Sequence, residues 1–211
     1  MLADYIINTP VASIIFALTV GLSIYAFSNP QIYGRMMLHP YTVYRDRSKW
    51  PMVITSGLIH KDWTHLIFNM LTFYFFGFAL ESLLVVQSGP IGHIYFAGLY
   101  VVALVLSDIP TIMQQKDNYN YHSLGASGAI SAVLFSFILF YPRTMLYLFM
   151  AIPIPAFVFG FLYLGYCIWA SKNARDGINH DAHLYGALTG ILVTLLLYPW
   201  IFRHFAEQFG F

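Results

Sequence analysis

Apolar residues run through this 211-residue chain in long stretches that charged side chains interrupt only at wide intervals. Six intervals carry no charge at all, and they are 5–34, 63–80, 82–107, 118–142, 144–171 and 182–202. A helix needs roughly 20 apolar residues, within a range of about 17–25, to cross a bilayer, and every interval is long enough. The pattern therefore predicts an all-α, polytopic membrane helix bundle.

We expect one domain over residues 1–211 with six transmembrane helices. Their predicted ranges are about 10–27, 64–86, 91–106, 127–140, 146–170 and 182–202. The connection 28–63 contains three prolines and is too polar to span, so it is predicted to lie at the membrane interface. Pro153 and Pro155 fall within the fifth range, and they should loosen or kink that helix.

Composition supports the membrane interpretation. Only 9% of the residues are charged, whereas a soluble domain has about 25%. A soluble helical bundle would need polar faces that repeat every 3.6 residues, and none occurs in 12–27, 93–106 or 187–202. The N-terminus lacks a basic region, so the first apolar run is expected to remain as a helix rather than to be removed as a signal peptide. The single cysteine, Cys167, excludes a disulfide within the chain, and a net charge of +1 without a basic block predicts no nucleic-acid binding.

Helix parity places the polar residues of three helices together. In a six-helix protein the second, fourth and sixth helices begin on the same side of the membrane. Their first turns contain His65 and Asn69, then Ser127, then His183. Polar groups inside a membrane are costly and indicate a functional site. These four residues are therefore predicted to lie at one membrane depth.

Ser127 lies where a loop turns into the fourth helix, between Gly125 and Gly128. Small neighbours leave its hydroxyl unshielded, and a helix N-terminus has free backbone N–H groups. These groups and the helix dipole can hold a developing oxyanion. The structural alternative is a small-residue packing seam, which is common between membrane helices.

His183 shares one helix face with Gly186 and Gly190, which form a GxxxG pair. If that face packs on the helix 127–140, its imidazole can meet the hydroxyl of Ser127. A serine hydroxyl is a weak nucleophile without such a base, and histidine titrates near neutrality. Asp181 would point about 160° away on a helix, so we predict a Ser–His dyad without an acid. A histidine that is simply packed or interfacial is the alternative.

His65 and Asn69 lie four residues apart, so their side chains share a helix face and could form an oxyanion hole. The alternative is a pair of structural hydrogen bonds between helices. Several other polar residues are expected to stabilise loops or to lie at solvated helix ends. They are His60, His122, His180, Glu81, Asp108 and Lys116.

These residues together resemble the rhomboid intramembrane serine proteases. Gly125-Ala126-Ser127-Gly128 is similar to the family's GxSG motif, and Ala182-His183 with its two following glycines is similar to AHxxGxxxG. The family's HxxxxHxxxN pattern is matched by three residues of the second helix and its approach, His60, His65 and Asn69. The resemblance covers residues from about 50 to 190, with the three motifs in order on the second, fourth and sixth helices.

The resemblance implies a short central fourth helix and a water-filled cavity open to the outer face. It implies that Ser127 attacks the scissile carbonyl while His183 acts as general base and then as general acid. The Ser127 backbone N–H, His65 and Asn69 would stabilise the oxyanion. Supporting positions would be Gly125, Gly128, Gly186, Gly190 and His60.

The resemblance also implies the substrates and the setting. Single-span membrane proteins, cut beside a small residue, would enter between the fifth helix and a cap loop at 119–123. No metal and no cofactor is implied. An integral position in a lipid bilayer is expected, in a bacterial inner membrane.

The chain departs from the family pattern in three ways. Trp50 is followed by Pro51 and Met52, where the family often has a Trp-Arg pair. Ser131 stands four residues after Ser127, where some members carry an aromatic residue that packs on the catalytic imidazole. The loops that the family topology places outside contain most of the basic residues, although the positive-inside rule favours the opposite orientation. We favour the family orientation because the first loop is long and mostly interfacial.

Two other classes of function compete with the protease. A non-proteolytic rhomboid-like protein would bind membrane segments without cutting them. A metal or haem protein would use histidines, namely His60, His65, His180 and His183. Catalytic zinc takes three protein ligands, often with acidic support, and the chain has no HExxH motif and few helix-borne carboxylates.

Overall fold

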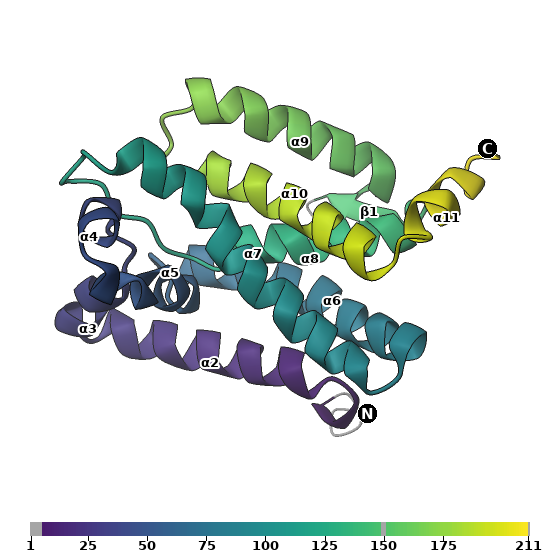
Figure 1. Cartoon of the computed structure of the whole chain (residues 1–211), viewed down its shortest axis with the longest axis horizontal. Coiled ribbons are helices and arrows are strands. Elements are labelled where there is room, and N and C mark those ends of the chain that lie inside the picture. Colours follow the sequence, from purple (N-terminus) through teal and green to yellow (C-terminus); the bar gives the residue numbers. More distant parts are fainter. Residues whose placement is uncertain (1–5, 149–150, 211) are drawn as a thin grey trace.

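The computed structural model describes residues 6–148 and 151–210, and within them the chain is mostly helical (Figure 1). Its long helices are α2 (Pro10–Phe27), α6 (Trp63–Ser88), α7 (Ile91–Gln115), α8 (Ser127–Phe140), α9 (Ala156–Asn173) and α10 (His180–Leu197). Over the described residues, α2, α6, α7 and α10 are long and apolar enough to cross a membrane. With the shorter apolar α8 and with α9, they form the helical membrane bundle that the sequence predicts.

Helix α8 is the centre of the bundle. It contacts α6, α7, α9 and α10, and only Ser127, Phe137 and Leu139 among its 14 residues are not fully buried. In Figure 1 it lies between α7 and α10, with α2 along one edge of the molecule and α9 along the other. At 1.5 Å per residue α8 is about 21 Å long, which is less than the roughly 30 Å of hydrocarbon in a bilayer. One end of α8 therefore lies below the lipid headgroups.

The first connection contains a series of short helices rather than an irregular loop. They are α3 (Pro30–Met36), α4 (Pro40–Arg45), η1 (Arg47–Lys49), α5 (Pro51–Thr55) and η2 (Ser56–Leu58). Three of them begin with proline, whose fixed φ and missing N–H suit the first helical position. Leu38, Val43 and Val53 pack with Ile112 of α7 in a small core of their own. This packing holds the connection against the bundle.

The helix predicted at 146–170 is wrong in its first part. Residues Met145–Leu148 (β1) and Ile152–Pro155 (β2) form an antiparallel hairpin, and α9 begins only at Ala156. Residues before proline are driven into extended conformations. Ile152 and Ile154 each precede a proline, so this segment forms a strand, and the expected kink within the helix does not occur.

Two further boundaries differ from the prediction. Helix α7 continues nine residues past the predicted end at 106, through Pro110, to Gln115. The last predicted helix, 182–202, is divided where Tyr198 precedes Pro199 in an extended conformation. A separate helix, α11 (Ile201–Glu207), follows.

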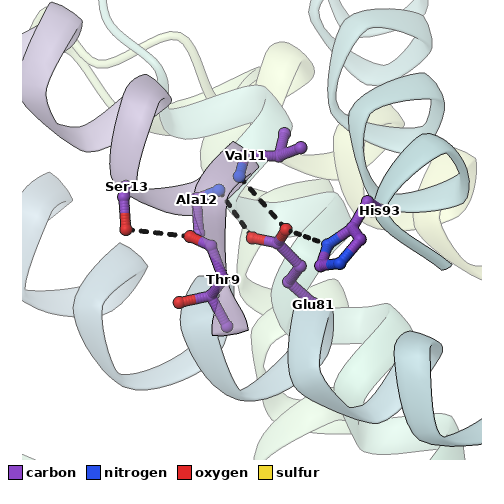
Figure 2. Close-up of polar contacts among 6 residues, drawn as sticks. All are labelled: Thr9, Val11, Ala12, Ser13, Glu81 and His93. Atoms are coloured by element: carbon purple, nitrogen blue, oxygen red, sulfur yellow. Dashed lines mark hydrogen bonds and ion pairs between the residues drawn. The ribbon is translucent and has the colours of Figure 1, made fainter. Parts of the chain in front are cut away.

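The start of α2 is completed by a carboxylate from α6 (Figure 2). Glu81 is fully buried, and its two oxygens accept hydrogen bonds from the backbone N–H groups of Val11 and Ala12, at 3.1 and 2.6 Å. His93 of α7 contacts the same carboxylate at 2.6 Å. The expectation that Glu81 lies at a solvated helix end is therefore wrong, because this residue joins three helices through the unsatisfied first turn of α2.

Candidate functional site

A polar cavity of about 910 Å³ opens at the N-terminal ends of α6, α8 and α10. Its lining includes all four residues that helix parity places together, His65, Asn69, Ser127 and His183. The cap segment before α8 and the loop before α10 supply most of its other polar groups. Three helices distant in sequence therefore deliver their polar first turns to one space inside an otherwise apolar bundle.

Close packing of glycines fixes α10 against α8. A Cβ atom added at Gly186 would lie 2.1 Å from the carbonyl oxygen of Gly128, and one added at Gly190 would lie 2.2 Å from that of Ala132. Only glycine fits at either position. The two contacts are one turn apart and run in the same direction along both helices. They confirm that the GxxxG face of α10 packs on the small residues of α8.

The backbone at Gly125 places Ser127 beside His65. Gly125 has a φ of +115°, and its N–H donates a 2.9 Å hydrogen bond to the carbonyl of Ser56. A Cβ atom there would lie 2.6 Å from Cε1 of the His65 ring. Both the φ value and the imidazole require glycine. Ser127 then begins α8 two residues later, half-buried, where the first N–H groups of the helix have no partner within it.

His183 is positioned by the capping of α10. The side chain of Asn179 accepts a hydrogen bond from the N–H of Ala182 at 3.1 Å. Its amide nitrogen donates to Thr111 of α7 at 2.9 Å and to Ser123 of the cap segment at 3.3 Å. One N-cap residue thus connects the first turn of α10 to α7 and to the segment that leads into Ser127.

His180 also holds this first turn. It is buried, and its Nε2 contacts the Asp176 carboxylate at 3.1 Å. Its ring meets that of His183 edge-on at 5.9 Å between centroids. The pKa of Asp176 is lowered, chiefly by the N–H of Ile178, so this exposed residue remains an anion.

His65 and Asn69 occupy one face of the first turns of α6, as their spacing predicts. Asp62 caps this helix by accepting from the N–H of His65 at 2.8 Å. The N–H of Lys61 points at His65 Nδ1 at 3.5 Å, which favours the neutral tautomer with its proton on Nε2. Asn69 uses one amide proton on the carbonyl of His65 at 2.9 Å and retains the other.

His60 lies behind His65 and is fully buried outside the cavity lining. Its ring meets His65 edge-on at 4.9 Å, and its Nδ1 lies 3.0 Å from the hydroxyl of Ser23. Burial lowers the pKa of His60 to about 3, so the ring is neutral. This placement agrees with a supporting role through His65 rather than with a role in the cavity.

The expected hydrogen bond between Ser127 and His183 is not formed. Among the described residues both side chains line the cavity, but none of the hydrogen bonds joins them. Catalytic hydrogen bonds are often long before substrate binds. The structure thus brings the two residues into one space without closing the contact.

Sequence reasoning missed three side chains that reach this region. Asp108 was expected at a solvated helix end, yet it lines the cavity from α7 because that helix is longer than predicted. Asp181 also lines it. Tyr163 of α9 lies against His183 and bonds to Ser131. The departure at Ser131 was the one signal in the sequence that another group must face His183.

Metal ligands do not converge among the residues that the structure describes. No three His, Cys, Asp or Glu side chains there are grouped as a metal ion requires. No observation of the site therefore favours the metal or haem alternative.

Comparison with known proteins places the chain among relatives of one kind. The family model of the Rhomboid domain matches residues 47–200. The chain is 27% identical to the putative rhomboid protease YdcA of Bacillus subtilis, over 89% of its own length and 88% of that protein. It is 32% identical to the mitochondrial RHOMBOID-like protein 12 of Arabidopsis thaliana over 64% of its length, and 26% identical to the mitochondrial Rhomboid protein 1 of Saccharomyces cerevisiae over 74%.

The matched segments cover 43% of the Arabidopsis protein and 43% of the yeast protein, so the chain spans less than half of either. Two relatives carry mitochondrial names and one is bacterial. The relatives support an integral membrane protein and do not assign it to one membrane, so the bacterial inner membrane stays a prediction.

Proposed function

The chain belongs to the rhomboid family, and from this premise we propose that it is an intramembrane serine endopeptidase with Ser127 as nucleophile and His183 as base. The observation that carries the proposal is the shared cavity, in which both side chains lie beside the closest contact between α8 and α10. A packing seam alone would not require a polar cavity of this size at its end.

The chemistry follows from the positions of the four side chains. Ser127 Oγ attacks the scissile carbonyl while His183 takes the hydroxyl proton, and His183 then returns that proton to the leaving amine. Negative charge develops on the carbonyl oxygen. The free N–H of Ser127 at the start of α8, the Nε2 proton of His65 and the second amide proton of Asn69 are available to stabilise it.

The position of the cavity defines the class of substrate. It is polar and roomy enough for water, whereas the surrounding helices expose large apolar side chains. A transmembrane segment that partly unwinds into it would have its backbone solvated there and nowhere else in the bilayer. We therefore propose single-span membrane proteins as substrates, which pass α9 and the cap loop on the way to Ser127.

The test is probe labelling and reporter cleavage with purified protein in detergent or vesicles. A fluorophosphonate should label wild type at Ser127, and Ser127→Ala should lose both labelling and cleavage. Ser136→Ala is the matched control, since Ser136 lies on the same helix and bonds to Thr194 rather than facing the cavity. Cleavage that persists in Ser127→Ala would remove Ser127 from the mechanism.

One observation favours a second candidate. The absence of a Ser127–His183 hydrogen bond in the described structure is what a non-proteolytic rhomboid-like protein would also show. Such a protein would bind transmembrane segments in the same cavity without cutting them. A wild-type protein that binds a transmembrane peptide but is not labelled by fluorophosphonate would establish this candidate instead.

A further inference from the structure

The catalytic base proposed above has an aromatic neighbour on a different helix from the one that the family pattern uses. Tyr163 of α9 faces His183 with ring centroids 6.4 Å apart and an angle of 24° between the planes. Offset stacked rings interact at centroid distances of about 4.5–7 Å. Position 131, where some relatives carry an aromatic residue, holds a serine in this chain.

The hydroxyl of Tyr163 ties it to that serine. The Ser131 hydroxyl donates to the carbonyl of Ser127 at 2.8 Å, and the Tyr163 oxygen lies 2.7 Å from the Ser131 oxygen. Because the proton of Ser131 is already used, Tyr163 donates to Ser131. A chain of two hydrogen bonds therefore runs from α9 to the first residue of α8.

Packing leaves the Tyr163 ring little freedom. Phe159 stacks on it at 5.7 Å, and Phe135 of α8 lies at 5.6 Å. The ring is thus held on two sides by aromatic residues and at its tip by Ser131. Its position relative to His183 is set by the helix that carries it.

We propose that Tyr163 is a positioning residue for His183, and that the Tyr163–Ser131 pair replaces an aromatic residue at position 131. The ring keeps the imidazole facing Ser127 and provides a π face for the imidazolium that forms when His183 takes the proton. Because the ring belongs to α9, displacement of α9 by a substrate moves the support of the base. This inference rests on the proposed protease function.

The experiment compares three variants of the full chain by steady-state cleavage and by the rate of fluorophosphonate labelling. Tyr163→Leu should lower kcat and the labelling rate about tenfold or more with KM unchanged, because the base is misplaced while substrate binding is not. Tyr163→Phe keeps the ring and should stay within about threefold of wild type. Phe159→Leu is the matched control, since it removes a ring of the same stack that does not face His183, and it should leave kcat unchanged.

A rescue variant separates positioning from general packing. Tyr163→Leu combined with Ser131→Tyr places the ring on α8 and should recover kcat relative to Tyr163→Leu alone. If Tyr163→Leu does not fold, a folded double variant carries the test: activity supports the inference and inactivity overturns it.

Labelling distinguishes the two levels of proposal. Wild type that is not labelled at Ser127 defeats the protease itself. Labelled wild type with equally fast labelling of folded Tyr163→Leu overturns the role of Tyr163 alone. A fall in Phe159→Leu equal to that in Tyr163→Leu overturns it as well.

Discussion

One methyl group added at Gly186 tests whether the contact of α10 with α8 sets the geometry of the proposed dyad. The new Cβ would lie 2.1 Å from the carbonyl oxygen of Gly128, whereas ordinary contact begins at 3.4 Å. The obstacle is backbone, which cannot rotate away, so α10 must move from α8 by about 1.3 Å, the difference between these two distances. Overpacking of this kind costs about 1–3 kcal/mol of stability.

The effect on activity should exceed the effect on stability. His183 lies one turn from Gly186, and a displacement of about 1 Å in a catalytic group can cost about 100-fold in rate. Gly186→Ala should therefore lower kcat by up to about 100-fold, measured on a transmembrane reporter, while the protein remains folded by its thermal melt. Gly190→Ala should strain the same interface one turn further from the base, so it should lose a similar stability and less activity.

Gly98→Ala is the matched control on α7, because a Cβ there meets nothing within 4 Å. It should be neutral or slightly stabilising, since alanine is a better helix former than glycine by about 1 kcal/mol. Wild-type kcat in Gly186→Ala would refute the reasoning. It would show either that α10 can shift without moving His183, or that His183 is not the base.

Three further predictions concern the surroundings of the site. Asn69→Ala should lower kcat about 100-fold with KM unchanged if its free amide proton meets the oxyanion, and an unchanged kcat in a cleavage assay would remove it from that role. Glu81→Gln keeps the shape of the side chain but loses its charge and one acceptor, so the melting temperature should fall, by an amount equivalent to about 1–3 kcal/mol; an unaltered melt would mean that the first turn of α2 does not need the carboxylate. The folded pKa of His60, about 3, lies below its ordinary 6.5, so the unfolded chain binds the extra proton and stability is lost as pH falls from 6.5 towards 3, by at most about 1.4 kcal/mol per pH unit; His60→Asn should flatten this slope in pH-dependent melts, and an identical slope would exclude His60 as its source.

The sequence predicts the positions of the transmembrane helices well where hydropathy alone decides them. The predicted ranges 10–27 and 127–140 match α2 and α8, because apolar runs end there at residues that cannot continue them. The hairpin before α9 was missed, because an apolar run with two prolines reads as a kinked helix until its strand pairing is known. Pairing between β1 and β2 is a tertiary fact that hydropathy does not contain.

The same division holds at the site. Parity and the GxxxG spacing correctly place His65, Asn69, Ser127 and His183 around one space, because both follow from helix geometry. Glu81 was misread, because a lone acid at a helix end looks solvated unless the helix that it caps is seen beside it. Tyr163 could not be found either, since sixteen tyrosines share the sequence and only the rotation of α9 selects the one that faces His183.

The carboxylate at the start of α2 bears on how the chain is assembled. Helix α2 is synthesised before α6 and α7, yet the two N–H groups of Val11 and Ala12 receive their partner from Glu81, about 70 residues later, and the carboxylate meets His93 later still. During insertion, Glu81 would have to enter the bilayer as an isolated acid unless α2 is already waiting with its N–H groups exposed. The earliest helix thus serves as the receptor for the second, and its docking is completed from behind as translation proceeds.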